Sequence, residues 1–311
     1  MAKIVFVHGM RMQHYRATAL RDRWYQSLVR GLRQTDWGRQ NPGEIPAKSD
    51  VDLVYWADLF RPTGELPPPD ITKGSLGDDV RAAYYRLLRG VVRTADKLSF
   101  WDATGHPRGP VARMVNGLVY QSALYMNNGT LPHPDPEGEQ GAFFQIQARF
   151  AAALRPDTRI VIAHSLGSVI AYEGLCYNAH RVDTLITVGS PLATPGLILD
   201  PLRQRLQRLI NHDAHLTPPW PGVRQWHNYF APADVWCVPV KQLAPIFGGG
   251  GHDPESAIRD IEVVHGNPHD FVETHKLATY FRHREIHDDL AAALSVKAAV
   301  PSPPARVAVA Q

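Results

Sequence analysis

The stretch that decides the fold is residues 159–171, which read RIVIAHSLGSVIA. It begins with a short run of β-branched residues, typical of a strand buried on both faces of a parallel sheet. The run passes through Ala163, His164 and Ser165 directly into a second apolar stretch, which we interpret as a helix. A buried strand, a tight turn that carries a serine, and a helix are the context in which such a turn presents a nucleophile.

The turn requires small residues on both sides of the serine. Ala163 and Gly167 stand two residues before and two residues after Ser165, where a tight turn brings the chain against neighbouring backbone. Ala163 occupies a position at which glycine is commoner. The serine itself is expected to have strained backbone angles. The helix that begins at Leu166 would direct its N-terminal amides toward the serine oxygen, where negative charge would develop.

Strands and helices alternate on both sides of this turn. We expect strands at residues 4–7, 51–56, 159–163, 184–188, 223–229 and 261–264, and helices at 17–34, about 140–154, 166–179, near 197–210 and near 284–295. This alternation predicts an α/β fold with a doubly wound, mostly parallel sheet. The helix near 197–210 is amphipathic, which favours a helix covering the sheet over a lid or a membrane-surface contact.

One segment interrupts the alternation. Residues from about 60 to 140 contain proline-rich breaks and two helical stretches, near 78–98 and 109–127. We interpret them as a helical insertion over the edge of the sheet, within a single domain of residues 1–295, and as the wall of an acyl pocket. Residues 296–311 are rich in Ala, Val and Pro and predict a flexible tail.

The composition excludes several classes of protein. With 311 residues, 44% hydrophobic and 20% charged, the chain matches a folded globular protein. Its net charge of +3 comes from scattered basic residues, which argues against nucleic acid as a partner. Its two cysteines, Cys176 and Cys237, exclude a disulfide framework. No apolar run has the length of a membrane helix, and residues 4–7 are better explained as a strand than as part of a leader, so we expect a cytoplasmic protein.

These motifs resemble the α/β-hydrolase superfamily, and the Ala-His-Ser-x-Gly turn is similar to that of small bacterial lipases and esterases. The superfamily pattern includes a His-Gly turn after an earlier strand, and His8-Gly9-Met10 follows the first predicted strand. The resemblance implies that the backbone N–H groups of Met10 and Leu166 form an oxyanion hole. It also implies that His8, Gly9 and His164 lie against the substrate. The first strand already precedes the oxyanion turn, as in minimal versions of the fold.

The resemblance also implies an acid and a base, in that order, after Ser165 in the chain. Asp234 follows the strand predicted at 223–229 and is the implied acid, whereas Asp213 and Asp253 follow no convincing strand. The implied base is His275, which is followed five residues later by an aromatic residue that packs its loop. His269 is the alternative base.

This set predicts acyl transfer from an ester or a related acyl compound. Ser165 would attack the carbonyl, His275 would carry the proton, and Asp234 would orient the imidazole. Thioesterases, amidases, peptidases, lipases and acyltransferases use the same set. A catalytically silent fold that serves as a binding or regulatory module is the alternative from another class.

The expected partner is a small-molecule or lipid acyl substrate. We expect no integral membrane segment, and contact with a membrane surface stays open. No cofactor or metal is expected. The residue after His283 is not the glutamate that the zinc-protease motif requires between His283 and His287. Gly248–Gly251 is not followed by the Lys-Ser/Thr of a phosphate loop. The oligomeric state stays open.

Overall fold

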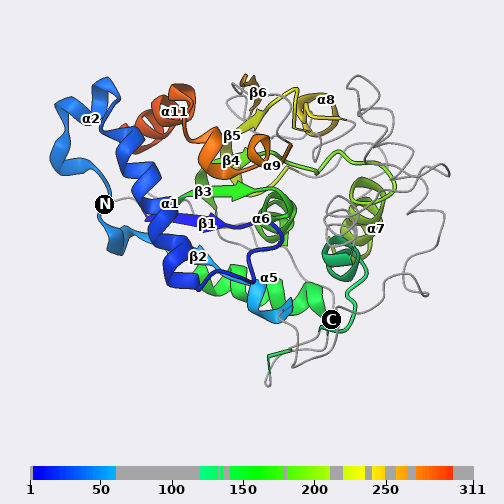
Figure 1. The fold of residues 1–311 in the computed structure, drawn as a ribbon. Helices are drawn as coiled ribbons and strands as arrows, with labels where there is room; N and C mark the ends of the chain where they lie inside the picture. The colour runs from blue at the N-terminus through cyan, green and yellow to red at the C-terminus, as the bar shows by residue number, and fades with distance from the viewer. Residues whose placement is uncertain are drawn as a thin grey trace.

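Six short strands form the centre of the molecule. The computed structural model describes residues 3–60, 120–131, 134–135, 141–177, 181–210, 220–234, 240–248, 257–264 and 271–296. In these ranges the strands are β1 (Lys3–Val7), β2 (Val51–Val54), β3 (Thr158–His164), β4 (Val182–Val188), β5 (Val223–Phe230) and β6 (Ala257–Glu262). They pair in parallel in the order β2-β1-β3-β4-β5-β6 (Figure 1). The predicted α/β class with a doubly wound parallel sheet is confirmed.

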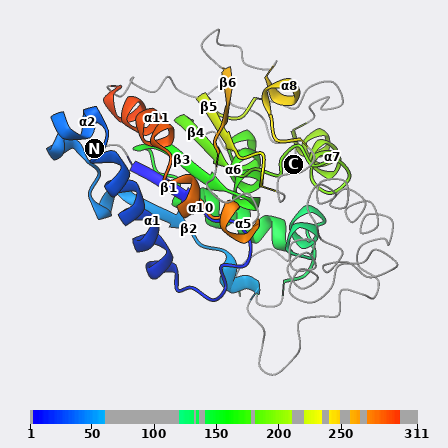
Figure 2. The same cartoon turned by 45° about the horizontal axis from the view of Figure 1, so that its top comes forward.

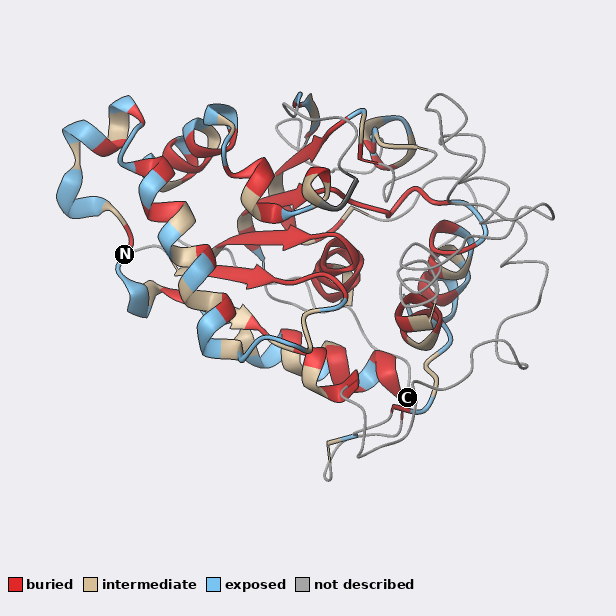
Figure 3. Cartoon of the chain, viewed as in Figure 1, coloured by how far each residue is buried: buried red, intermediate tan, exposed pale blue. Residues whose placement is uncertain are grey.

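The central strands are apolar on both faces. In β1, Ile4 and Phe6 belong to one buried cluster, whereas Val5 and Val7 belong to the other. The side chains of β3 alternate between the clusters in the same way. A strand that is covered on both sides shows no alternation of polar and apolar residues, which is why these strands appear in the sequence as continuous apolar runs. Figure 3 shows their burial along the middle of the sheet.

Helices cover each face. The first face carries α1 (Ala17–Leu32), α10 (Leu277–Tyr280) and α11 (Arg284–Ser295) (Figure 2). The second carries α5 (Ala142–Ala153), α6 (Leu166–Tyr177), α7 (Leu199–Ile210) and α8 (Ala244–Phe247). The described ranges also contain the short helices α2 (Asp36–Gln40) and α9 (Phe271–Thr274), the 3-10 turns η1 (Pro42–Glu44), η2 (Lys48–Asp50) and η3 (Ala57–Phe60), and helical residues at 120–126.

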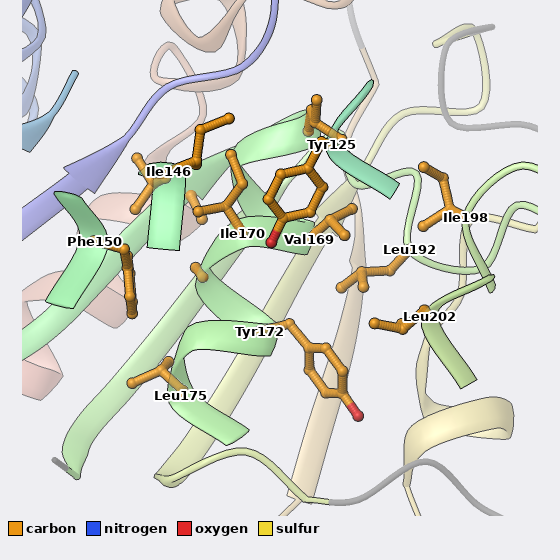
Figure 4. Packing of buried hydrophobic residues seen from close by; sticks show 14 of the residues in the cluster. Tyr125, Ile146, Phe150, Val169, Ile170, Tyr172, Leu175, Leu192, Ile198 and Leu202 are labelled. Carbon is orange, nitrogen blue, oxygen red and sulfur yellow. The ribbon is translucent and has the colours of Figure 1, made fainter. Parts of the chain in front are cut away.

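The amphipathic helix α7 turns its apolar face into the core. Leu202 lies beside Leu192 and Ile198 in the cluster that surrounds α6 (Figure 4). On the same helix, the buried Arg205 donates from Nε and Nη2 to the two carboxylate oxygens of Glu173 on α6, each at 2.8 Å. A buried charge is tolerated only when it is paired in this way. The apolar face of α7 is therefore buried beside α6, and its predicted role as a cover of the sheet stays a prediction.

The order of the strands creates a place where a ligand can bind. The chain crosses from β1 to β2 through α1 on the first face, and then from β3 to β6 in the opposite direction with its helices on the second face. This arrangement satisfies the preference for right-handed crossovers. The direction reverses between β1 and β3, so the loops at their carboxyl ends separate. Ligands of doubly wound folds bind at such a reversal.

Some boundaries differ from prediction. The last strand covers Ala257–Glu262, so the prediction of 261–264 was wrong in its bounds. The polar pair Arg259 and Asp260 interrupts the apolar pattern by which a strand is predicted from sequence. The Asp260 carboxylate accepts hydrogen bonds from Asn228 and from the backbone of Leu243 and Ala244, so a polar side chain here stabilises the edge of the sheet.

Other predictions fall on parts of the chain that are not described. The predicted helix at 78–98 lies outside the described residues, and the one at 109–127 is described only from residue 120, with residues 120–126 helical. The predicted tail lies outside them from residue 297 onward. Within the described ranges, each helix is too short or too polar to cross a bilayer.

Candidate active site

Ser165 stands in a strained turn between β3 and α6. Its φ is +55°, a left-handed value that is uncommon for residues other than glycine. The backbone holds it there, because its N–H donates to the Val188 carbonyl at 3.0 Å and its own carbonyl accepts from the Ser168 hydroxyl at 2.6 Å. At Gly167, a Cβ atom would lie 2.4 Å from the carbonyl oxygen of Val7. The tight turn and the requirement for a small residue therefore agree with the prediction.

The structure brings His275 and Asp234 to Ser165. The Ser165 Oγ lies 2.8 Å from His275 Nε2, and the His275 Nδ1 lies 2.8 and 3.0 Å from the two carboxylate oxygens of Asp234. Asp234 is fully buried, whereas the His275 side chain is 17% exposed. A carboxylate only accepts hydrogen bonds, so Nδ1 carries the proton. Nε2 is then the acceptor for the serine hydroxyl.

The two partners come from different parts of the chain. Asp234 lies in the turn after β5, where its N–H donates to the Ala231 carbonyl at 3.0 Å. His275 lies between α9 and α10. Tyr280, the aromatic residue expected to pack this loop, is buried, and its hydroxyl donates to Asp234 at 2.7 Å. The sequence pattern suggested the packing but gave no signal for this hydrogen bond.

Gly189 is a site residue that the sequence analysis missed. It directly follows β4 with φ of +56°, and a Cβ atom there would lie 3.0 Å from Asp234 Oδ2 and 3.3 Å from the His275 ring. A side chain at this position would therefore crowd the acid and the base, which would have to shift to make room for it. A glycine immediately after a buried strand, in line with the ends of β1 and β3, is a signal that could have identified it.

His8 holds the turn that follows β1. Its Nδ1 donates to the Gly9 carbonyl at 2.6 Å, and its Nε2 accepts from the Trp56 backbone N–H at 3.0 Å. Burial lowers the pKa of His8 to about 4, so the ring is neutral at pH 7. At Gly9, a Cβ atom would lie 2.6 Å from the Cβ of Ser165. His8 and Gly9 are buried and are not among the described residues that line the cavity, so the contacts seen here hold the turn, and their predicted contact with the substrate stays a prediction.

His164 connects the serine turn to the loop of the base. Its Nε2 donates to the backbone carbonyl of His275 at 2.5 Å, and the centroids of the two rings are 4.9 Å apart. Burial, together with the nearby His275, lowers the pKa of His164 to about 3. The neutral ring lines the cavity, which agrees with the predicted position against the substrate.

A cavity of about 670 Å³ opens onto these side chains and is lined by Met10, His164, Ser165 and His275 among others. This volume is typical of sites for small molecules. Leu166 is the first residue of α6, so its N–H has no acceptor within the helix. Met10 directly follows Gly9, which lies against Ser165, and it lines the same cavity as Ser165. The structure thus places both predicted oxyanion donors on segments that contact Ser165.

The competing candidates fall outside the described residues. These are the alternative base His269 and the weaker acids Asp213 and Asp253. Within the described ranges, no group of three or more His, Cys, Asp or Glu side chains is arranged to hold a metal ion. The sequence matches no protein-family model and no curated protein. The chemistry of the site therefore carries the functional argument.

Proposed function

We propose that the protein is a serine hydrolase that cleaves a carboxylic ester or a related acyl bond through an acyl-enzyme intermediate. The observation that carries the proposal is the 2.8 Å contact between Ser165 Oγ and His275 Nε2, with Asp234 on the other ring nitrogen. A serine hydroxyl is a weak nucleophile until a base removes its proton. A base oriented by a buried carboxylate meets this requirement.

The proposed reaction has two halves. In the first, His275 takes the hydroxyl proton while Ser165 Oγ bonds to the acyl carbon, and the imidazolium then gives this proton to the leaving alcohol as the ester bond breaks. In the second, a water molecule gives a proton to His275 and bonds to the acyl carbon. The bond between Ser165 Oγ and the acyl carbon then breaks, the acid is released, and the imidazolium returns its proton to Ser165 Oγ. Asp234 stabilises the imidazolium in both halves.

Negative charge develops on the carbonyl oxygen of the substrate in each half. The N-terminus of α6 begins next to Ser165, and the partial positive charge of its amides favours an anion there. We propose that the N–H groups of Leu166 and Met10 bind this oxygen. Loss of one such donor typically slows a reaction by about a hundredfold to a thousandfold.

The resemblance to the α/β-hydrolase superfamily supports this proposal. The parallel sheet, the serine turn at its centre and the order serine, acid, base along the chain fit that superfamily. We therefore also propose membership of it. Fold alone does not distinguish an esterase from a thioesterase, an amidase or an acyltransferase.

Covalent labelling tests the proposal without knowledge of the substrate. A fluorophosphonate probe should modify Ser165, as mapped by mass spectrometry of the labelled peptide. His275→Gln should slow labelling by about a thousandfold or more, because the base acts with the serine as one unit. His283→Gln, a change of the same kind away from the cavity, should label at the normal rate.

The outcome decides between the two classes of function. Labelling at Ser165 that depends on His275 would support the hydrolase. Absence of labelling on a folded protein would favour a silent binding or regulatory module. If Ser165 is labelled, the rates with matched oxygen esters, thioesters and anilides would then rank the acyl bond that is cleaved.

A further inference from the structure

The charged side chains that line the cavity at Ser165 are basic. Arg11, Arg23 and Lys276 line it, and none of the Asp and Glu residues in the described ranges does. Lys276 is neutralised because its Nζ pairs with the carboxylate of Glu273. Arg11 and Arg23 form no ion pair with any residue that the structure describes. Among the residues that the structure describes, Arg11 and Arg23 thus line the cavity without a counter-charge.

Arg23 is placed on the cavity by helix geometry. On α1, Arg23 and Trp24 follow Leu20 by three and four residues and therefore share one face of the helix with it. Leu20 and Trp24 are buried, whereas Arg23 is exposed at the rim. The centroid of the Trp24 ring lies 6.3 Å from that of His164, beside the base. The cavity therefore continues from the reacting groups along an apolar wall to a cationic rim.

Arg11 is fixed by its backbone. It directly follows Met10, has φ of +61° and donates its N–H to the side-chain oxygen of Gln121 at 3.1 Å. A left-handed residue other than glycine persists only where its surroundings hold it. The exposed Arg11 side chain therefore starts from the same fixed turn that contains the proposed oxyanion donor Met10.

We propose that the natural substrate carries an anionic oxygen group, a carboxylate or a phosphate, at the end of an apolar body, and that Arg11 and Arg23 bind it. This inference rests on the proposed hydrolase function. Guanidinium groups match the geometry of both anions and are always charged. Met12, Leu20 and Trp24 would contact the apolar body while Ser165 attacks the acyl carbon. A neutral lipid would leave both guanidinium groups without a partner.

Three fluorophosphonate probes test this specificity. They share one alkyl chain, which ends in a carboxylate, a phosphate or a methyl ester. We expect either or both anionic probes to label Ser165 about tenfold faster than the neutral one. The advantage should fall between 0.1 and 1 M salt, because the screening length shortens from about 10 to about 3 Å.

Variants assign the effect to the two arginines. Arg11→Gln and Arg23→Gln should each reduce the preference for the anion by about threefold, so that together they account for the tenfold preference, and this is the size expected of one exposed ion pair. Arg23→Lys keeps the charge and should retain most of the preference. Arg30→Gln removes an equal charge from an exposed position of α1 that does not line the cavity, and should leave the preference unchanged. The rate with the neutral probe reports whether each variant keeps an intact site.

The results separate the two proposals. Equal labelling by the three probes, or faster labelling by the neutral one, would overturn the anionic substrate and leave the hydrolase standing. A preference that survives both Arg→Gln changes would overturn the assignment to Arg11 and Arg23. If no probe labels Ser165 on the folded protein, the hydrolase fails and this inference fails with it.

Discussion

The Tyr280 hydroxyl lies 2.7 Å from Asp234 Oδ2 and also accepts the backbone N–H of Ala231 at 3.1 Å. One side chain thus connects the carboxylate to the end of β5. A fully buried carboxylate needs donors to remain charged. Tyr280 supplies one donor and His275 another, so we regard Tyr280 as a positioning residue for the acid.

Tyr280→Phe should therefore affect both stability and pH dependence. The free energy of unfolding should fall by about 1–3 kcal/mol, because a buried N–H and a buried carboxylate each lose a partner. The carboxylate, with one donor fewer, should stabilise the imidazolium of His275 more strongly. The acid limb of the pH profile for Ser165 labelling should then move to higher pH. Urea titrations and labelling rates from pH 5 to 8 measure both effects.

Tyr229→Phe is the matched control. The hydroxyl of Tyr229 donates to Asp289 at 2.5 Å and lies 3.0 Å from the Glu285 carbonyl, away from the cavity. Its loss should cost a similar free energy and leave the pH profile unchanged. If Tyr280→Phe changed stability alone, its role would be structural and not the positioning of the acid.

Alanine variants of Gly189 and Gly196 distinguish the effect of backbone strain from that of crowding in the site. Both have a left-handed φ, +56° and +71°, but a Cβ atom at Gly189 would meet Asp234 and His275, whereas one at Gly196 would meet no atom within 4 Å. Through the left-handed conformation alone, either change to alanine should cost about 0.5–1 kcal/mol of stability, because the lower flexibility of alanine in the unfolded chain offsets part of the strain. Only Gly189→Ala should displace the acid and the base and slow labelling, by about a hundredfold. Equal labelling rates in the two variants would contradict the close fit at Gly189.

Acid should destabilise the protein through its buried histidines. Burial lowers the pKa of His8 from 6.5 to about 4 and that of His164 from 6.5 to about 3. Below pH 6.5 the unfolded chain binds protons that the folded chain does not, so stability is full above this pH and falls as the pH is lowered toward 4. Each histidine contributes a slope of about 1.4 kcal/mol per pH unit.

Denaturant titrations at pH 7, 6 and 5 measure this slope. His164→Gln retains a donor that can reach the His275 carbonyl but removes one titrating ring. It should therefore reduce the slope by about 1.4 kcal/mol per pH unit. An unchanged slope would mean that His164 is protonated in the folded protein.

Local signals allowed part of this structure to be predicted from sequence. The strands β1 and β3 and the serine turn could be identified because burial on both faces produces uninterrupted apolar runs, and because the close approach of the Val7 carbonyl to the turn requires a glycine at position 167. The edge strand β6 could not be placed correctly. Its polar side chains serve contacts with Asn228 and α8 that have no sequence periodicity.

The rest of the candidate site depends on tertiary contacts. His275 lies 110 residues from Ser165 and 41 from Asp234 in the chain, and in the sequence only the aromatic residue five positions later favours it over His269. The geometry joins it to both partners. Likewise, the sequence motifs predict that His8 and His164 lie near the serine, but only their buried hydrogen bonds show that they hold neighbouring backbone.

Replacement of the serine should reveal the strain in its turn. Ser165→Ala and Ser165→Gly both remove the hydroxyl, so neither should be labelled, and only the alanine keeps a Cβ atom at φ of +55°. The left-handed conformation costs about 1–2 kcal/mol with a Cβ atom, and the flexibility of glycine in the unfolded chain recovers part of this. The glycine variant should therefore unfold with a free energy about 0.5–1 kcal/mol higher than the alanine variant.

Ser168 supplies the opposite expectation. It lies in the first turn of α6 and, unlike Ser165, is not among the residues with a positive φ. Ser168→Ala and Ser168→Gly both remove its hydroxyl. Here the glycine variant should be the less stable of the two, by about 1 kcal/mol, because glycine is unfavourable in a helix. Urea titrations of the four variants give both differences. If glycine were the less stable choice at both positions, the turn at Ser165 would store no strain, and the contacts of Ser165 with Val188 and Ser168 would account for its conformation without cost.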